Sequence, residues 1–369
     1  MHVRRVLMPD TGTESWTLLG DDHGPVVPVE RWLAHLTAIG RSPNTVKGYA
    51  HDFKDWFAFL QRRGLDWREV QLEALGGFLE WLRLPPEARD GGVLLLPSAA
   101  DHCVESSMGR KLSALASFYL FHARHGVELG ELLVVLQPGG RRGGSWKPFL
   151  HHISKGKPQR RRTVNLKVPT RRPVVLAAGQ VQAILDACEH LRDRLLFAML
   201  FDAGVRIGEA LGLRHEDLAV AERELTVRRR HNDNRARAKS AAPRTVPISS
   251  ALMRLYADYL HGEYGELDSD YVFVNLWGQP RGHPMTYRTV YDLVRRLRRQ
   301  TGIDFEPHQF RHTYATWLLR NAAGKEAVKE LLGHAHIATT IDIYGHLTVE
   351  DTRRALEQAG WFAGRGVRL

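Results

Sequence analysis

The stretch PHQFRHTYATWLL, Pro307 to Leu319, places a histidine and an arginine three residues apart within an apolar helical pattern. His308 and Arg311 should therefore project from the same face of one helix. Apolar residues at helical spacing predict that this helix faces a core and leaves the His–Arg pair at its rim; they are Phe310, Tyr314, Trp317 and Leu318. A His-x-x-Arg pair alone is common, so its meaning depends on the rest of the chain.

Two further stretches place polar side chains at expected helix ends. GVRIGEALGL, residues 204–213, carries Arg206 just ahead of a helix start, with Glu209 three residues later. KEAVKELLGHAHIATTIDIYGHL, residues 325–347, predicts a helix that ends at Gly333 and exposes His334, followed by a helix that carries Tyr344. Taken singly, a helical tyrosine is usually a packing residue, and Arg206 could simply pair with Glu209.

In this order, the stretches VRIGEALGL, PHQFRHTYAT and LLGHAHIATTIDIYGHL resemble the tyrosine recombinases, the phage integrase family. The resemblance extends from about Val29 to Trp361 and implies a helical core-binding domain and a catalytic domain that together clamp duplex DNA. It implies that Tyr344 is the nucleophile and that Glu209 supports the active site. The implied catalytic set is Arg206, Lys239, His308, Arg311, His334 and Tyr344.

The lysine assignment depends on the expected β-hairpin. Lys239 precedes Val246 and Pro247 of the second strand by the family's usual interval. The turn between Arg230 and Arg244 is long, however, and Arg235 and Arg237 lie near Lys239 in the sequence. A hairpin arginine of this kind or His308 is therefore an alternative general acid.

The same residue types suit transfer of a phosphodiester to a phenol. This reaction needs a nucleophile, stabilisation of negative charge on the phosphoryl oxygens and a proton for the departing 5′-hydroxyl. Two guanidinium groups can bind the nonbridging oxygens, histidines can orient the phosphate, and a lysine ammonium suits the general acid. The resulting 3′-phosphotyrosine preserves the energy of the bond, so a second DNA end can reverse the step without ATP.

A basic segment between Pro138 and Pro173 accounts for the charge of the chain. It holds eleven Lys or Arg and no Asp or Glu, while the remaining 41 basic residues equal the 41 acidic ones. A basic strap between two balanced domains suits contact with a phosphate backbone, although it could also be only a solvated linker. The residues expected to bind nucleic acid are Arg141, Arg142, Lys155, Lys157, Arg160, Arg161, Arg162 and, on the helical domain, Lys47.

Hydrophobic periodicity predicts a mainly α-helical protein of two domains with a small β-hairpin in the mixed α/β catalytic domain. The expected organisation is a preface over 1–27 with one strand near SWTLLG, a helical core-binding (SAM-like) domain over 28–137, the basic linker over 138–172 and the catalytic domain over 173–369. RELTVRRR and RTVPIS are the expected hairpin strands.

Several classes of protein lack support in the sequence. The two cysteines, Cys103 and Cys188, are far apart, which argues against a disulfide framework or a zinc site and favours a reducing cytoplasm. No apolar run is long enough to span a membrane, and the N-terminus lacks a signal-peptide core. The motifs GxxxxGK[ST], HExxH and GxGxxG are absent, so we expect no cofactor.

The sequence therefore predicts a site-specific recombinase that cleaves and rejoins double-stranded DNA, as the integrase or transposase of a mobile element. Family resemblance implies a homotetramer on two paired DNA sites. The alternatives are a chromosome-dimer resolvase, a type IB topoisomerase and a non-catalytic DNA-binding protein. A two-metal transposase is a further alternative, and activity in excess EDTA would distinguish a tyrosine recombinase from it.

Overall fold

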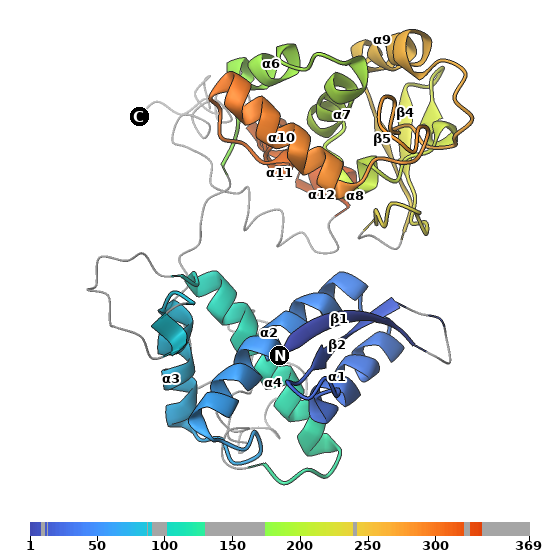
Figure 1. Cartoon of the computed structure of the whole chain (residues 1–369). Coiled ribbons are helices and arrows are strands. Elements are labelled where there is room, and N and C mark those ends of the chain that lie inside the picture. Colours follow the sequence, from blue (N-terminus) through green and yellow to red (C-terminus); the bar gives the residue numbers. More distant parts are fainter. Residues whose placement is uncertain are drawn as a thin grey trace, which may run out of the picture. The chain divides into compact units, whose positions relative to one another are not determined.

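The computed structural model describes residues 1–8, 12, 14–86, 88–90, 102–129, 174–238, 242–320 and 325–333. The chain divides into two compact units, Met1–Thr170 and Arg171–Leu369 (Figure 1). As predicted, the described fold is mainly helical with small antiparallel sheets. The expected basic linker lies outside the described residues.

The first unit combines a β-hairpin with helices. Its elements are β1 His2–Leu7, β2 Glu14–Leu19, α1 Val27–Ala38, α2 Pro43–Arg63, α3 Leu72–Arg83, a short 3₁₀ helix Ala88–Asp90 and α4 Glu105–Arg124. All four predicted helices are confirmed. The ends of α2 follow the sequence signals, because Ser42 Oγ accepts a hydrogen bond from the Thr45 amide at 3.2 Å and Gly64 ends the helix with φ 64°. Trp32, Phe53 and Phe118 contact one another through their rings in the core.

The preface differs from the expectation of one strand. β1 and β2 pair antiparallel, with Val3 opposite Leu18, and Leu18 is buried in the helical core. Ser15 Oγ lies 2.9 Å from Thr37 Oγ1 of α1. The first strand was missed because consecutive arginines at positions 4 and 5 obscure the alternation of apolar and polar residues.

The second unit surrounds a central helix. Its elements are α6 Ala178–Asp186, α7 Leu191–Asp202, α8 Ile207–Ala210, a 3₁₀ turn His215–Asp217, β3 Leu218–Ala219, β4 Glu224–Val227, β5 Arg244–Pro247, α9 Ser250–Tyr259, η3 Leu260–Tyr264, α10 Tyr287–Thr301, α11 Pro307–Arg320 and α12 Lys325–Leu332. α7 contacts α6, α8, α9 and α11 and is buried along most of its length.

The predicted hairpin strands are confirmed. β4 pairs antiparallel with β5, with Leu225 opposite Val246, and the two-residue β3 completes a sheet of order β3-β4-β5. The sequence did not predict β3, because two residues are too few to show a periodicity.

The tight passage from α7 to α8 brings the site together. Gly204 has φ 60°, and a Cβ at this position would lie 2.2 Å from Cδ1 of Tyr314 on α11. Only glycine combines this backbone conformation with so close an approach. The chain can therefore run from α7 directly across α11 into Arg206.

Two expectations for α11 were wrong. Arg311, expected at the rim, is only 1% exposed, and Trp317, expected in the core, is 59% exposed. The buried face of α11 instead includes Phe310, Arg311 and Thr313, because backbone carbonyls and a carboxylate accommodate the buried guanidinium. Among the described helices, none has the length and apolar character needed to cross a bilayer.

Candidate active site

A carboxylate at the first turn of α8 organises the site. Arg206 precedes the helix in extended conformation (φ −76°, ψ 150°), and Glu209 folds back onto it. Glu209 Oε2 accepts a hydrogen bond from the Arg206 amide at 2.9 Å, and Oε1 accepts one from Arg206 Nη1 at 2.9 Å. This is the pairing expected when a glutamate occupies the third position of a helix. Glu209 is 3% exposed.

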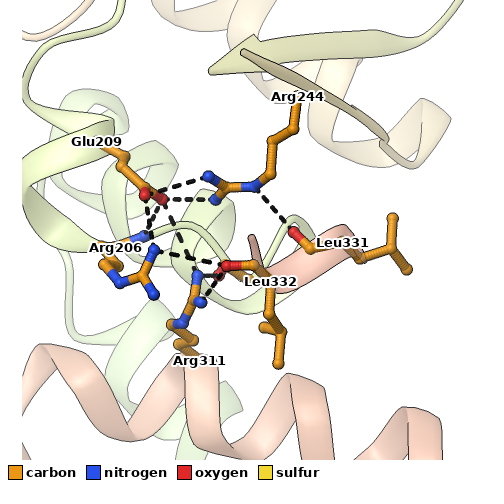
Figure 2. Close-up of polar contacts among 7 residues, drawn as sticks. Arg206, Glu209, Arg244, Arg311, Leu331 and Leu332 are labelled. Carbon is orange, nitrogen blue, oxygen red and sulfur yellow. Dashed lines mark hydrogen bonds and ion pairs between the residues drawn. The ribbon is translucent and has the colours of Figure 1, made fainter. Parts of the chain in front are cut away.

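A second arginine, which the sequence did not single out, binds the same carboxylate. Arg244, the first residue of β5, donates from Nη1 to Glu209 Oε1 at 3.1 Å and from Nη2 to Oε2 at 2.6 Å. Its Nε donates to the carbonyl of Leu331 near the end of α12, at 2.9 Å. Arg244 therefore joins the hairpin strand to both α8 and α12 (Figure 2).

Arg311 approaches the cluster from α11. Its Nη1 donates to the Gly204 carbonyl at 2.6 Å and lies 3.9 Å from Glu209 Oε2, while its Nη2 donates to the Leu332 carbonyl. Arg206 Nη1 reaches the same Leu332 oxygen at 3.5 Å. The two arginines assigned to catalysis thus converge on the last residue of α12, as Figure 2 shows.

The charge of this cluster is unbalanced. Burial alone would raise the pKa of Glu209, but the hydrogen bonds and charge of Arg244, together with those of Arg206, outweigh burial and hold the pKa at about 2. Glu209 is therefore ionised at neutral pH, and three guanidinium groups surround one carboxylate. The surplus positive charge suits an anion such as a phosphodiester.

His308 lies in the first turn of α11, about one helical turn before Arg311, and is exposed. Its ring centroid lies 4.4 Å from that of His312. Burial, followed by the charges of His308 and Arg311, lowers the pKa of His312 to about 4. His312 is therefore neutral at physiological pH, whereas His308 is exposed to solvent.

The structure brings Arg206, Glu209 and Arg311 together; Lys239, His334 and Tyr344 lie outside the described residues. The described chain leads up to each of these segments. The loop before Lys239 is packed down, because Asn234 Nδ2 donates to the carbonyls of Leu211 and Met285 at 2.9 and 2.7 Å. As predicted, α12 ends at Gly333, which has φ 61° and directly precedes His334.

Lys47, predicted to bind nucleic acid, is exposed on α2, and its Nζ lies 4.7 Å from the ring centroid of Trp16. The other predicted nucleic-acid contacts lie outside the described residues. Within the described ranges, no group of three or more His, Cys, Asp or Glu side chains is arranged to hold a metal ion.

Comparison with known proteins adds family relationships to this geometry. The model of the phage integrase family matches residues 174–351, and that of the phage integrase N-terminal SAM-like domain matches residues 29–126. Transposase A from transposon Tn554 of Staphylococcus aureus is 36% identical over 355 residues, which cover 96% of this chain and 96% of that protein. Tyrosine recombinase XerC of Methylobacterium sp. (strain 4-46) is 31% identical over 344 residues, 91% of this chain and 94% of that protein.

Solved structures share the fold at lower identity. The Tn1549 transposon integrase in complex with a circular intermediate DNA matches with a TM-score of 0.61 at 16% identity, over 90% of this chain and 99% of that one. The XerH recombinase bound to its palindromic difH substrate matches with a TM-score of 0.56 at 18% identity, over 94% of this chain and 90% of that one.

Proposed function

The chain belongs to the phage integrase family of tyrosine recombinases, which cleave and rejoin DNA, and we propose that it serves a mobile genetic element as its transposase. The similarity to Transposase A over 96% of both chains supports this role. The substrate is double-stranded DNA. The protein binds it as a homotetramer on two paired sites, and the reaction takes place in the cytoplasm.

The observation that carries the chemical assignment is the convergence of Arg206 and Arg311 beside the ionised Glu209. Within the described part of the chain, the guanidinium of Arg206 donates to protein acceptors through Nη1 alone, so Nε and Nη2 remain for nonbridging phosphate oxygens. Two guanidinium groups at one phosphate stabilise the charge that develops during displacement.

The remaining roles follow the order of bond changes. The phenolic oxygen of Tyr344 attacks the scissile phosphorus and forms a 3′-phosphotyrosine, while the bond to the 5′-oxygen breaks. Lys239 gives its proton to that 5′-oxygen, and His308 and His334 orient the phosphate and assist proton movement. Attack of another strand's 5′-hydroxyl on the phosphotyrosine reverses the step and rejoins the DNA.

Removal of one hydroxyl tests the nucleophile. Tyr344→Phe should abolish covalent protein–DNA complexes on a nicked duplex that carries the element end, because no neighbouring group replaces the aligned phenol. Tyr314→Phe is the control: this tyrosine packs against Gly204, and its variant should still form the complex. A denaturing gel of labelled DNA scores the covalent band; a band from Tyr344→Phe would overturn the assignment.

The biological role needs a second assay. A plasmid that carries the gene with its natural flanking DNA should yield a rejoined donor junction when the wild-type protein is expressed, and none with Tyr344→Phe. Junction-specific amplification and sequencing detect the product. Relaxation of supercoiled plasmids without any specific site would instead indicate a topoisomerase, and resolution of plasmid dimers without excision would indicate a resolvase. DNA binding without a covalent band from the wild-type protein would indicate a non-catalytic binding protein.

A further inference from the structure

Arg244 is committed entirely to protein contacts. Its side chain is 8% exposed, and each guanidinium nitrogen has a partner within the described chain: Nε on Leu331, Nη1 and Nη2 on the two oxygens of Glu209. This bidentate geometry fixes the plane of the guanidinium as well as its position. Arg244 therefore differs from Arg206, whose Nε and Nη2 have no hydrogen-bond partner within the described chain.

The other side of this guanidinium supports the turn that ends α12. A Cβ at Gly333 would lie 3.0 Å from Arg244 Nη1 and 3.2 Å from its Cδ, so the glycine backbone packs directly on the arginine. Gly333 also has a positive φ, which glycine adopts without strain. The residue after this packed turn is His334, and Tyr344 follows ten residues later.

We propose that Arg244 is a positioning residue for DNA cleavage: it fixes the end of α12 to the Glu209 carboxylate and thereby fixes the point from which the chain continues into the segment with His334 and Tyr344. The inference rests on the proposed function, because it assigns a purpose to the segment that carries the proposed nucleophile. Arg244 contacts neither DNA nor the reacting atoms in this role.

The geometry explains why an arginine is required. A lysine ammonium in the same place can reach the carboxylate or the Leu331 carbonyl, but it cannot hold both oxygens of Glu209 and the carbonyl in one plane. A glutamine loses the charge as well. Since misplacement of a reacting group by about 1 Å can slow a reaction about 100-fold, Arg244→Gln should slow cleavage by about that factor and Arg244→Lys by less.

The test compares cleavage with DNA affinity in the full-length protein. Rates of covalent complex formation are measured at saturating nicked duplex that carries the element end, and affinities are measured on the same duplex. Arg244→Lys keeps the charge of the cluster, so it should bind DNA with unchanged affinity and unchanged salt dependence but cleave more slowly than wild type. Arg244→Gln should cleave more slowly still. A substrate with a 5′-bridging phosphorothiolate should not restore their rates, because the defect concerns alignment rather than protonation of the leaving group.

Arg230→Gln is the matched control. Arg230 makes a comparable bidentate bridge to Asp217, with Nη1 at 2.6 Å and Nη2 at 2.9 Å, but it does not contact Glu209 or α12. Its variant should lose similar stability while its cleavage rate at saturating DNA stays within about twofold of wild type. If Arg230→Gln cleaves as slowly as Arg244→Gln, loss of a buried ion pair explains the effect and the positioning role is wrong.

Three results separate the possible failures. If wild-type protein gives no covalent complex, the proposed function itself fails. If wild type cleaves and folded Arg244→Lys cleaves equally fast, only the inference about Arg244 fails. Arg244→Lys keeps the positive charge, so it tests the positioning role even if Arg244→Gln does not fold. If Arg244→Gln instead reduces the slope of log affinity against log salt by about 0.9, the loss of one phosphate contact, then Arg244 binds a phosphate directly, and the positioning role is again overturned.

Discussion

Replacement of Glu209 by glutamine perturbs the cluster at its centre with little change of shape. The carboxylate accepts four hydrogen bonds, two from Arg206 and two from Arg244. In Glu209→Gln, one acceptor oxygen becomes an NH₂ group that faces N–H donors, and the negative charge among the arginines disappears. The guanidinium of Arg244, 8% exposed, then has no counter-charge at hydrogen-bond distance within the described chain.

The magnitude follows from burial. Removing one member of a buried ion pair costs about 3–5 kcal/mol, because the remaining charge stays buried without a partner. For a unit of this size, a loss of 1 kcal/mol lowers Tm by about 2–4 °C. We therefore expect the unfolding transition of the catalytic unit to fall by roughly 6–20 °C in Glu209→Gln.

The pH dependence of unfolding gives an independent check that ionised Glu209 stabilises the fold. The pKa of Glu209 is about 2 in the folded protein, below its ordinary value of 4.5. Its ionised form therefore stabilises the fold fully above pH 4.5, and the stabilisation is lost as the pH falls toward 2. The difference between these pKa values corresponds to about 3 kcal/mol, so the stability gap between wild type and Glu209→Gln should narrow by that amount over the same pH range.

Calorimetry of the full-length protein measures these transitions. Glu216→Gln is the control, because Glu216 also pairs with an arginine, Arg230, but is 66% exposed. An exposed pair contributes at most about 1 kcal/mol, so this variant should unfold close to wild type. Either of two results would show that Glu209 is not the buried counter-ion described above. One is that Glu209→Gln lowers Tm no more than Glu216→Gln; the other is that the stability gap between wild type and Glu209→Gln does not change below pH 4.5.

Two further predictions concern residues outside the described ranges. Lys239→Ala should slow cleavage of ordinary DNA but cleave a 5′-bridging phosphorothiolate nearly normally, since a thiolate leaves without protonation; equal slowing of both substrates, measured by gel, would assign the general acid to another group. Replacing Arg160, Arg161 and Arg162 by Ala should weaken binding to all duplexes alike and reduce the slope of log affinity against log salt by up to about 0.9 per lost phosphate contact; unchanged binding isotherms would make the strap only a linker.

Local signals in the sequence predicted the parts of the fold that depend on neighbouring residues. Ser42-Pro43 and Gly64 bound α2 because capping and left-handed termination are properties of a few adjacent residues. The pairing of Arg206 with Glu209 was likewise visible, since the two lie three residues apart at a helix start. The family resemblance supplied the catalytic assignment of Arg311, which lies 102 positions after Glu209 in the chain.

The sequence did not reveal what Arg244 does, because every partner of this residue is distant in the chain. Glu209 lies 35 positions before it, and Leu331 lies 87 positions after it. An arginine at the start of a short strand ordinarily predicts an exposed residue, and no periodicity distinguishes it from Arg228 or Arg229, which directly follow the opposing strand. One signal was available in the sequence. Val246 and Pro247 located the second hairpin strand, and Arg244 lies two residues before Val246, so its place at the start of that strand could be predicted.

The same distance effect explains the wrong prediction for Arg311, and it bears on how the site works. A guanidinium at an apolar helix face looks misplaced until the Gly204 and Leu332 carbonyls and the Glu209 carboxylate are brought to it from three other segments. Carbonyls at the end of α12 carry partial negative charge, which offsets part of the surplus positive charge of Arg206, Arg244 and Arg311. They offset only part of it, because three full charges face one carboxylate. A phosphodiester would supply the missing negative charge, so the repulsion that remains among these arginines is relieved when the expected substrate binds.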